Sequence, residues 1–148
     1  MKKLLFIFPL FAFTYPTADI EIVPIKLEQI HITVVELDIP SLANAIIFVE
    51  SSNNDSAYCK VEDAVGCMQI RRTMVRDINR ILKTQRKQHR YKYKDRWNRL
   101  KSIEMFNIYI EHYGLDTSEE IARAWNGGPR GYKKSATIKY WNKVKKWL

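Results

Sequence analysis

Residues 41–52 read SLANAIIFVESS and join an apolar helical face to one carboxylate. The apolar side chains recur at spacings of three and four, the period of an amphipathic helix: Leu42, Ala45, Ile46 and Val49. Ser41 belongs to the residue types that cap helix N-termini, so we expect the helix to begin there. Glu50 then lies at the end of an apolar helix, where burial would raise the pKa of its carboxyl group.

Four more segments repeat this helical pattern towards the C-terminus. Their apolar positions fall on single stripes: Met74, Val75, Ile78, Ile81 and Leu82; Ile103, Phe106, Ile110 and Tyr113; Ile121, Ala124 and Trp125; Tyr140, Trp141, Val144 and Leu148. Ser102 can cap the second of these helices and Gly114 can end it. Thr117 and Glu120 form a capping-box pattern before the third. With 148 residues and 46% hydrophobic content, the sequence predicts one mainly α-helical domain at residues 41–148.

The first 40 residues differ in character from this domain. Two lysines precede an apolar run at residues 4–13, which is typical of a secretory signal, and Ala18 suits a processing site. The run is too short to span a bilayer. We therefore expect residues 1–18 to be a signal peptide and the protein to be exported to the periplasm or the extracellular space. Residues 19–40 are expected to be an extended segment or linker, with a short β element at residues 30–34, where apolar and polar side chains alternate.

The formal net charge of +9 predicts attraction to polyanions. Much of this charge lies between Lys83 and Lys101, where nine lysines and arginines accompany one acidic residue, Asp95, and we expect a loop or a solvated face. Aromatic residues interleave with the charge at residues 86–99, which leaves a nucleic-acid-binding module as an alternative. Export argues against that alternative. We expect no nucleic-acid partner and a peripheral attraction to an anionic cell wall.

The two cysteines, Cys59 and Cys67, are close in sequence. An oxidising compartment would allow a disulfide between them, which we expect, while two free buried thiols are the alternative. The three histidines, His31, His89 and His112, have no metal-ligand spacing. We expect neither a metal site nor a cofactor.

Three separated segments carry the residues of a candidate groove: Val49-Glu50-Ser51-Ser52, residues 64–70 (AVGCMQI) and residues 124–129 (AWNGGP). Each motif alone is weak, but the three in this order resemble the soluble lytic transglycosylase family of the lysozyme-like superfamily. The resemblance covers residues 42–148. It implies a lysozyme-like helical domain that acts on peptidoglycan glycan strands. We expect the possible short β element at residues 30–34 to precede the catalytic helix, and the protein to be a monomer.

The resemblance also implies roles for individual residues. Glu50 matches the catalytic acid of the family. Eight residues match or adjoin the positions that bind substrate: Ser51, Ser52, Gly66, Met68, Gln69, Trp125, Asn126 and Tyr140. Tyr140, three residues after Thr137, is similar to the tyrosine that contacts the acid in this family. The sequence departs from the family at Trp125, which replaces a tyrosine and its hydroxyl, and at Ala136, where a glutamate often precedes Thr137.

The number of carboxylates in the groove bears on the reaction. Hydrolysis normally uses two acidic groups, about 5–9.5 Å apart. The candidates for a second acid are Asp55, Glu62, Asp63 and Asp95, whereas Arg71 stands where goose-type lysozymes carry an acidic residue.

A lytic transglycosylase needs one acid. That acid protonates the glycosidic oxygen of the MurNAc–GlcNAc bond and then takes the proton of the muramyl sugar's own primary hydroxyl, which closes an anhydro ring. We favour this mechanism, with Glu50 in both roles. A hydrolysing muramidase and a non-catalytic glycan-binding component of a cell-wall or virion assembly are the alternatives.

Overall fold

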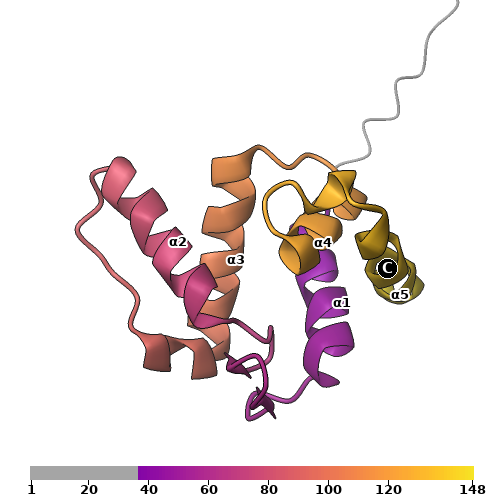
Figure 1. Ribbon diagram of the computed structural model, residues 1–148, viewed down its shortest axis with the longest axis horizontal. Helices are drawn as coiled ribbons and strands as arrows, with labels where there is room; N and C mark the ends of the chain where they lie inside the picture. Colours follow the sequence, from indigo (N-terminus) through magenta and orange to yellow (C-terminus); the bar gives the residue numbers. More distant parts are fainter. Residues whose placement is uncertain (1–36) are drawn as a thin grey trace, which may run out of the picture. The chain divides into compact units, whose positions relative to one another are not determined.

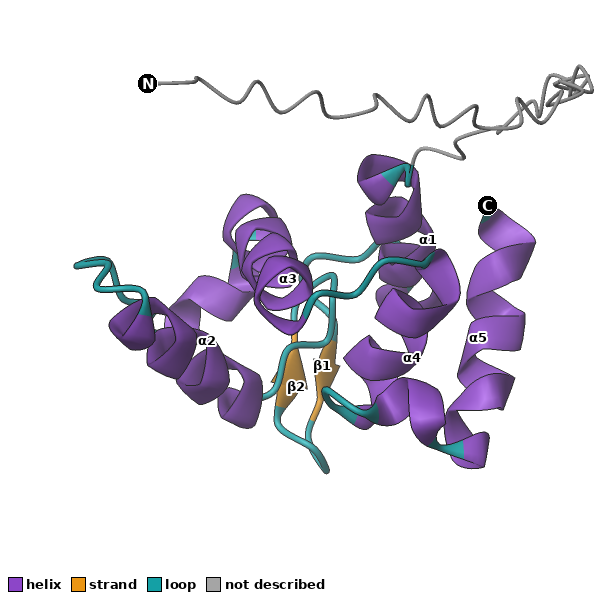
Figure 2. Cartoon of the chain, turned by 90° about the horizontal axis from the view of Figure 1, so that it is seen from above, coloured by secondary structure: helices purple, strands orange, loops and turns teal. Residues whose placement is uncertain are grey.

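Two groups of helices flank a small β-hairpin in residues 37–148, the part of the chain that the computed structural model describes (Figure 1). One group consists of α2 (Arg72–Thr84) and α3 (Arg99–Tyr113). The other consists of α1 (Ile39–Ser51), α4 (Ser118–Gly127) and α5 (Ile138–Val144). Figure 2 shows the hairpin between the two groups. The domain is mainly α-helical, as the sequence predicts.

Four short 3-10 helices complete the described elements: η1 (Tyr93–Trp97), η2 (Gly131–Lys133), η3 (Ser135–Thr137) and η4 (Lys145–Trp147). In residues 37–148 no helix is long and apolar enough to cross a membrane. The predicted signal peptide at residues 1–18 and the predicted β element at residues 30–34 lie outside the described residues.

Helix boundaries agree with the sequence at some ends and differ at others. The Thr117 hydroxyl accepts the Glu120 N–H at 3.2 Å, which confirms Thr117 as the N-cap of α4, whereas the Glu120 carboxylate accepts the Asp116 N–H and does not complete the predicted capping box. Gly114 ends α3 in the left-handed conformation, with φ of 57°. The predicted Ser41 cap is wrong, because the N-cap is Asp38, whose carboxylate accepts the Ser41 N–H at 3.0 Å. Helix α1 therefore begins two residues earlier, inside the segment predicted to be a linker.

The predicted Ser102 cap of α3 is also wrong. Asn98 is the N-cap, and its side chain accepts the Lys101 N–H at 3.0 Å. Ser102 is instead fully buried and donates to the carbonyl of Arg96 at 3.1 Å. The serine belongs to the core side of the helix, where its hydroxyl satisfies a backbone group that packing has removed from water.

The predicted apolar stripes form one core. The largest side chains with under 2% exposure come from both groups of helices. They include Leu42, Ile46, Ile47, Ile78, Ile81, Met105, Phe106, Tyr109 and Ile121. Burying a side chain of this size stabilises the fold by roughly 1.5–3 kcal/mol relative to leaving it exposed. Leu148 departs from its predicted stripe, since 58% of it is exposed and η4 replaces the end of the last helix.

A short β-hairpin follows α1 in the chain. Strands β1 (Tyr58–Cys59) and β2 (Ala64–Val65) pair antiparallel, with Tyr58 opposite Val65. Gly66 follows with φ of +79°, and a Cβ there would lie 2.1 Å from the carbonyl oxygen of Arg96. Gly66 therefore allows the hairpin to lie close to the backbone of η1, because it has no side chain to clash there.

The basic segment at residues 83–101 is only partly the solvated face that the sequence predicts. Tyr91, Asp95 and Arg96 are buried within it. The Arg96 guanidinium donates to the carbonyls of Asp63 at 2.6 Å and Ile70 at 2.9 Å, which ties η1 to the hairpin. A buried arginine is tolerated here because its donors meet carbonyl oxygens rather than empty space.

Candidate active site

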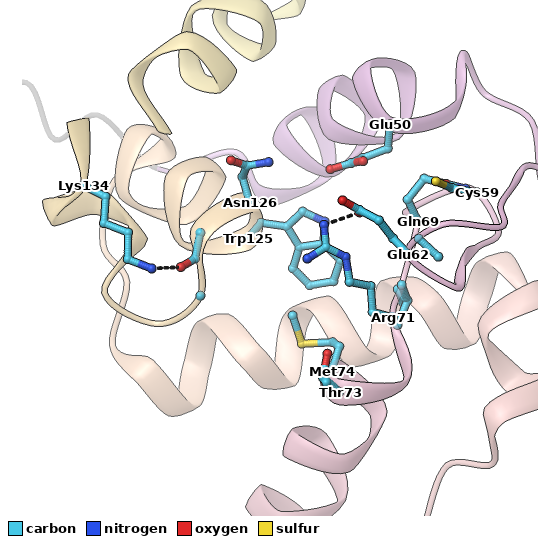
Figure 3. Close-up of a pocket in the computed structure, with 14 residues that line it drawn as sticks. Glu50, Cys59, Glu62, Gln69, Arg71, Thr73, Met74, Trp125, Asn126 and Lys134 are labelled. Carbon is cyan, nitrogen blue, oxygen red and sulfur yellow. Dashed lines mark hydrogen bonds and ion pairs between the residues drawn. The ribbon is translucent and has the colours of Figure 1, made fainter. Parts of the chain in front are cut away.

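A pocket of about 710 Å³ opens where α1, the hairpin, the start of α2 and the end of α4 meet (Figure 3). Its walls are formed by Glu50, Cys59, Glu62, Ala64, Gln69, Ile70, Arg71, Thr73, Met74, Trp125, Asn126, Gly127, Gly128 and Lys134. The three sequence motifs thus contribute to one site, although Glu50 and Asn126 lie 76 positions apart in the sequence.

Glu50 projects into this pocket from the last turn of α1. The carboxyl group is half-buried, and burial raises its pKa above the usual value, an effect that outweighs the hydrogen bond from Tyr140 and the positive charge of Arg71, which both lower it. The nearby charge of Glu62 raises it further. A desolvated carboxyl group of this kind retains its proton to higher pH and can act as an acid.

Tyr140 holds the Glu50 side chain in place. Its hydroxyl donates to Oε1 of Glu50 at 2.7 Å, across the interface between α5 and α1. Burial raises the pKa of Tyr140 well above that of a free tyrosine, so the phenol remains a donor. The contact leaves Oε2 of Glu50 for other partners, since a carboxyl group has two oxygens.

Thr137 positions Tyr140 at the start of α5. The Thr137 side chain is buried, and its hydroxyl oxygen lies 2.7 Å from the carbonyls of both Gly131 and Lys134 and accepts from Nε of Arg123 at 3.1 Å. These bonds fix the chain just before the helix. Tyr140 then faces Glu50 one helical turn later.

One aromatic and one amide side chain, Trp125 and Gln69, form further parts of the pocket wall. Trp125 is 8% exposed and makes edge-on contacts with Phe106 and Tyr109, at centroid distances of 5.1 and 5.9 Å. The core thus holds it rigidly at the wall of the pocket. The Gln69 amide N–H donates to the carbonyls of Ala57 and Gly66 at 3.2 and 3.0 Å, which leaves its carbonyl oxygen available.

Of the residues matched to substrate positions, Gln69, Trp125 and Asn126 line the pocket together with Glu50. Ser51, Ser52, Gly66, Met68 and Tyr140 do not. Ser51 donates to the Ile47 carbonyl at 3.0 Å, and Ser52 ends α1 with φ of 51°. Met68 has no exposed surface and belongs to the core. Ser51, Ser52 and Gly66 thus belong to helix ends and turns beside the groove. Tyr140 reaches Glu50 from α5.

Two charged residues that the motifs did not single out as groove residues, Glu62 and Arg71, form an ion pair in the pocket. Glu62 is one of the four candidates for a second acid, and the turn of the hairpin places it in the pocket beside Arg71. The other three candidates are paired elsewhere: Asp55 with Arg99, Asp63 with Arg72 and Arg96, and Asp95 with Lys101.

The predicted disulfide is not present in the structure, which holds Cys59 and Cys67 as free thiols. Their surroundings differ as well. Cys67 is buried in the core, and burial raises the pKa of its thiol, whereas Cys59 lines the pocket. Among residues 37–148 no group of three His, Cys, Asp or Glu side chains is arranged to hold a metal ion.

Comparisons with known proteins place most of the chain in one family. Residues 36–148 match the family model of the transglycosylase SLT domain. A shorter segment of 32 residues is 59% identical to invertebrate-type lysozyme 6 of Caenorhabditis elegans, covering 22% of this chain and 23% of that lysozyme. The match therefore spans less than a quarter of the lysozyme's length. The family match covers more than half of the chain, and the chain belongs to the transglycosylase SLT domain family.

Proposed function

We propose that this chain is a lytic transglycosylase that cleaves the MurNAc–GlcNAc bond of peptidoglycan glycan strands. The proposal rests on the raised pKa of Glu50 and on its contact with Tyr140 in the pocket. Burial raises the pKa of this carboxyl group, and Tyr140 engages one of its two oxygens. A carboxyl group that keeps its proton to higher pH than usual can protonate a leaving oxygen.

Glu50 acts twice in this mechanism. Its proton first moves to the glycosidic oxygen while the bond between that oxygen and C1 of the muramyl sugar breaks. The Glu50 carboxylate then removes the proton of the muramyl primary hydroxyl, whose oxygen bonds to C1 and closes the anhydro ring. The acid is regenerated, and no water is consumed. The attacking hydroxyl belongs to the same sugar, which gives it the advantage of proximity.

The pocket walls supply the remaining contacts for a sugar. Trp125 offers a rigid apolar surface, and the free carbonyl oxygen of Gln69 can accept a hydroxyl or amide N–H. Asn126 offers an exposed amide at the same wall. The likeness of a short segment to a lysozyme supports a glycan substrate.

A muramidase that hydrolyses the same bond is the second candidate, and the presence of Glu62 in the pocket favours it. A second carboxylate could activate a water on the far side of the sugar. Glu62 is engaged by Arg71, however, and an arginine that holds the carboxylate competes with the water it would have to activate. We therefore rank hydrolysis second.

We further propose that the protein is exported and acts as a monomer on the cell wall, without a nucleic-acid partner. The signal-like residues 1–18 support export, and the net charge of +9 supports attraction to an anionic cell wall.

The sugar ends released from purified peptidoglycan test the proposal. We expect mass spectrometry to find anhydro-muramyl ends, which weigh one water less than reducing ends. Reducing ends alone would support the muramidase instead. The absence of any product from folded protein would indicate a glycan-binding role and would contradict both.

A further inference from the structure

The Glu62–Arg71 ion pair faces the pocket, while the next pair along the same two segments does not. Glu62 and Arg71 both line the pocket, and about half of each side chain is exposed. Asp63 and Arg72 form the neighbouring pair, and neither of them lines the pocket. Figure 3 shows the Arg71 guanidinium directed into the pocket, beside Glu62 and Trp125.

The guanidinium of Arg71 has most of its donors available. An arginine carries five N–H donors, and in residues 37–148 the described partners of Arg71 engage only Nη2, through Glu62. Other arginines nearby are used by the fold. Arg72 pairs with Asp63 and lies over the Tyr93 ring, 4.7 Å from its centroid, and Arg96 is bound to carbonyls.

The charge of the pocket favours an anion when Glu50 is protonated. The charges of Glu62 and Arg71 then cancel, and the Lys134 ammonium, which donates to the Gly127 carbonyl at 2.6 Å, leaves the pocket one positive charge. Exposed ion pairs contribute little to stability, so a ligand carboxylate can share or take the place of Glu62. Arginine binds carboxylates through two parallel hydrogen bonds.

We propose that Arg71 binds a carboxylate carried by the lactyl-peptide substituent of the muramyl sugar, next to the bond that Glu50 cleaves. This inference rests on the proposed glycan substrate and adds a chemical requirement to it. The carboxylate belongs either to the lactyl group itself or to the peptide attached to it. In both cases the contact positions the muramyl sugar, and with it the glycosidic oxygen, against Glu50.

The test compares strands whose carboxylates are free with the same strands after amidation. One pair of substrates keeps the peptides, and the other has had them removed by an amidase, which frees the lactyl carboxylate. We expect the parent to cleave free-acid strands about tenfold better in kcat/KM than amidated ones, the size of one charge-assisted contact. A preference in the stripped pair assigns the lactyl group, and a preference in the peptide pair alone assigns the peptide.

Arg71→Gln should reduce this preference towards one. Arg72→Gln is the matched control, because it removes the same charge from the adjacent ion pair outside the pocket, and it should keep the preference. Arg71→Lys should give an intermediate ratio, since it keeps the charge but loses the planar fork. Thermal unfolding identifies any variant that does not fold. The parent's ratio of kcat/KM on free-acid strands to kcat/KM on amidated strands is measured without any variant.

Equal cleavage of free and amidated strands by the parent would overturn the inference and leave the proposed function standing. The same would follow if Arg71→Gln and Arg72→Gln changed the ratio equally. If the folded parent cleaves none of the four substrates, the proposed function itself fails.

Discussion

The two walls of the pocket carry a glutamate each, and their surroundings differ. Glu50 is on the helical wall, where burial raises its pKa and the buried Tyr140 donates to it at 2.7 Å. Glu62 is on the hairpin wall, half-exposed and paired with Arg71. One environment favours the protonated acid and the other holds a carboxylate. The comparison shows how the same side chain acquires two roles from desolvation on one side and a charged partner on the other.

The largest expected effect comes from removing the acid on the helical wall. Glu50→Gln is nearly isosteric, but its amide cannot donate a proton to the glycosidic oxygen. Release of soluble fragments from peptidoglycan should fall between about 10²- and 10⁴-fold, the usual contribution of a general acid. Circular dichroism of the variant serves as the folding control. A folded Gln variant with nearly normal turnover would remove Glu50 from the mechanism.

The same change on the hairpin wall should cost much less. Glu62→Gln removes a carboxylate that the transglycosylase reaction does not use, so the variant should still release anhydro ends, with a loss well below that of Glu50→Gln. The two variants are compared on one peptidoglycan preparation. If Glu62→Gln is as inactive as Glu50→Gln while folded, the second carboxylate is part of the chemistry and hydrolysis becomes the better proposal.

Two substitutions should shift the pH dependence of cleavage in opposite directions. The proposed reaction needs Glu50 protonated, so we expect kcat/KM to fall as pH rises through the pKa of Glu50. The Tyr140 hydrogen bond lowers this pKa and the Glu62 charge raises it. Tyr140→Phe should therefore move the alkaline limb to higher pH, and Glu62→Gln should move it to lower pH. Initial rates across pH check both, and shifts of the same sign would contradict this account of Glu50.

The acid on the helical wall should also reduce stability above its pKa. Because the pKa of Glu50 is raised on folding, the folded protein binds more protons than the unfolded chain, and stability falls as pH rises from the ordinary value of 4.5 through the folded pKa. Glu50→Gln lacks this loss. The Tm of the variant should match that of the parent below pH 4 and exceed it at pH 8, which scanning calorimetry can measure. A constant difference in Tm across this range would mean that burial does not perturb the group.

Much of this architecture follows from local sequence. The parts that local sequence does not predict are determined by contacts between residues far apart in the chain. The apolar helix face that ends at Glu50 and the helix cap at Thr117 each involve residues within one or two helical turns. The spacing of these residues is therefore enough to predict both features. Met68 was expected in the groove because of the motif around it, yet packing against the core decides its place. No pattern could indicate that Arg96 is buried, because its partners are the carbonyls of Asp63 and Ile70.

The candidate site divides in the same way. Glu50, Gln69, Trp125 and Asn126 belong to motifs that sequence identifies, and they line the pocket. Glu62 reaches the pocket only because the hairpin folds back onto the start of α2, where Arg71 lies. The hairpin has strands of two residues each, too short for an alternating pattern to predict.

The smallest effect on the chemistry should come from the exposed charge outside the pocket. Five basic residues of the segment between α2 and η1 and at the start of η1 are exposed, and none lines the pocket: Arg86, Lys87, Arg90, Lys92 and Lys94. Exposed charge acts by steering and nonspecific attraction, and at physiological salt it is screened over about 8 Å. Replacing these five residues by glutamine should weaken binding to intact walls at low salt, with a smaller difference at high salt.

Cleavage of short uncharged glycan fragments should stay the same in this variant, because Glu50, Glu62 and their partners are untouched. Paired wall-binding and fragment-cleavage assays across a salt series measure the two properties separately. A variant that binds walls like the parent at every salt concentration would show that this charge is not a tether. A folded variant that loses fragment cleavage would mean that the catalytic groove extends beyond the two walls to the basic segment.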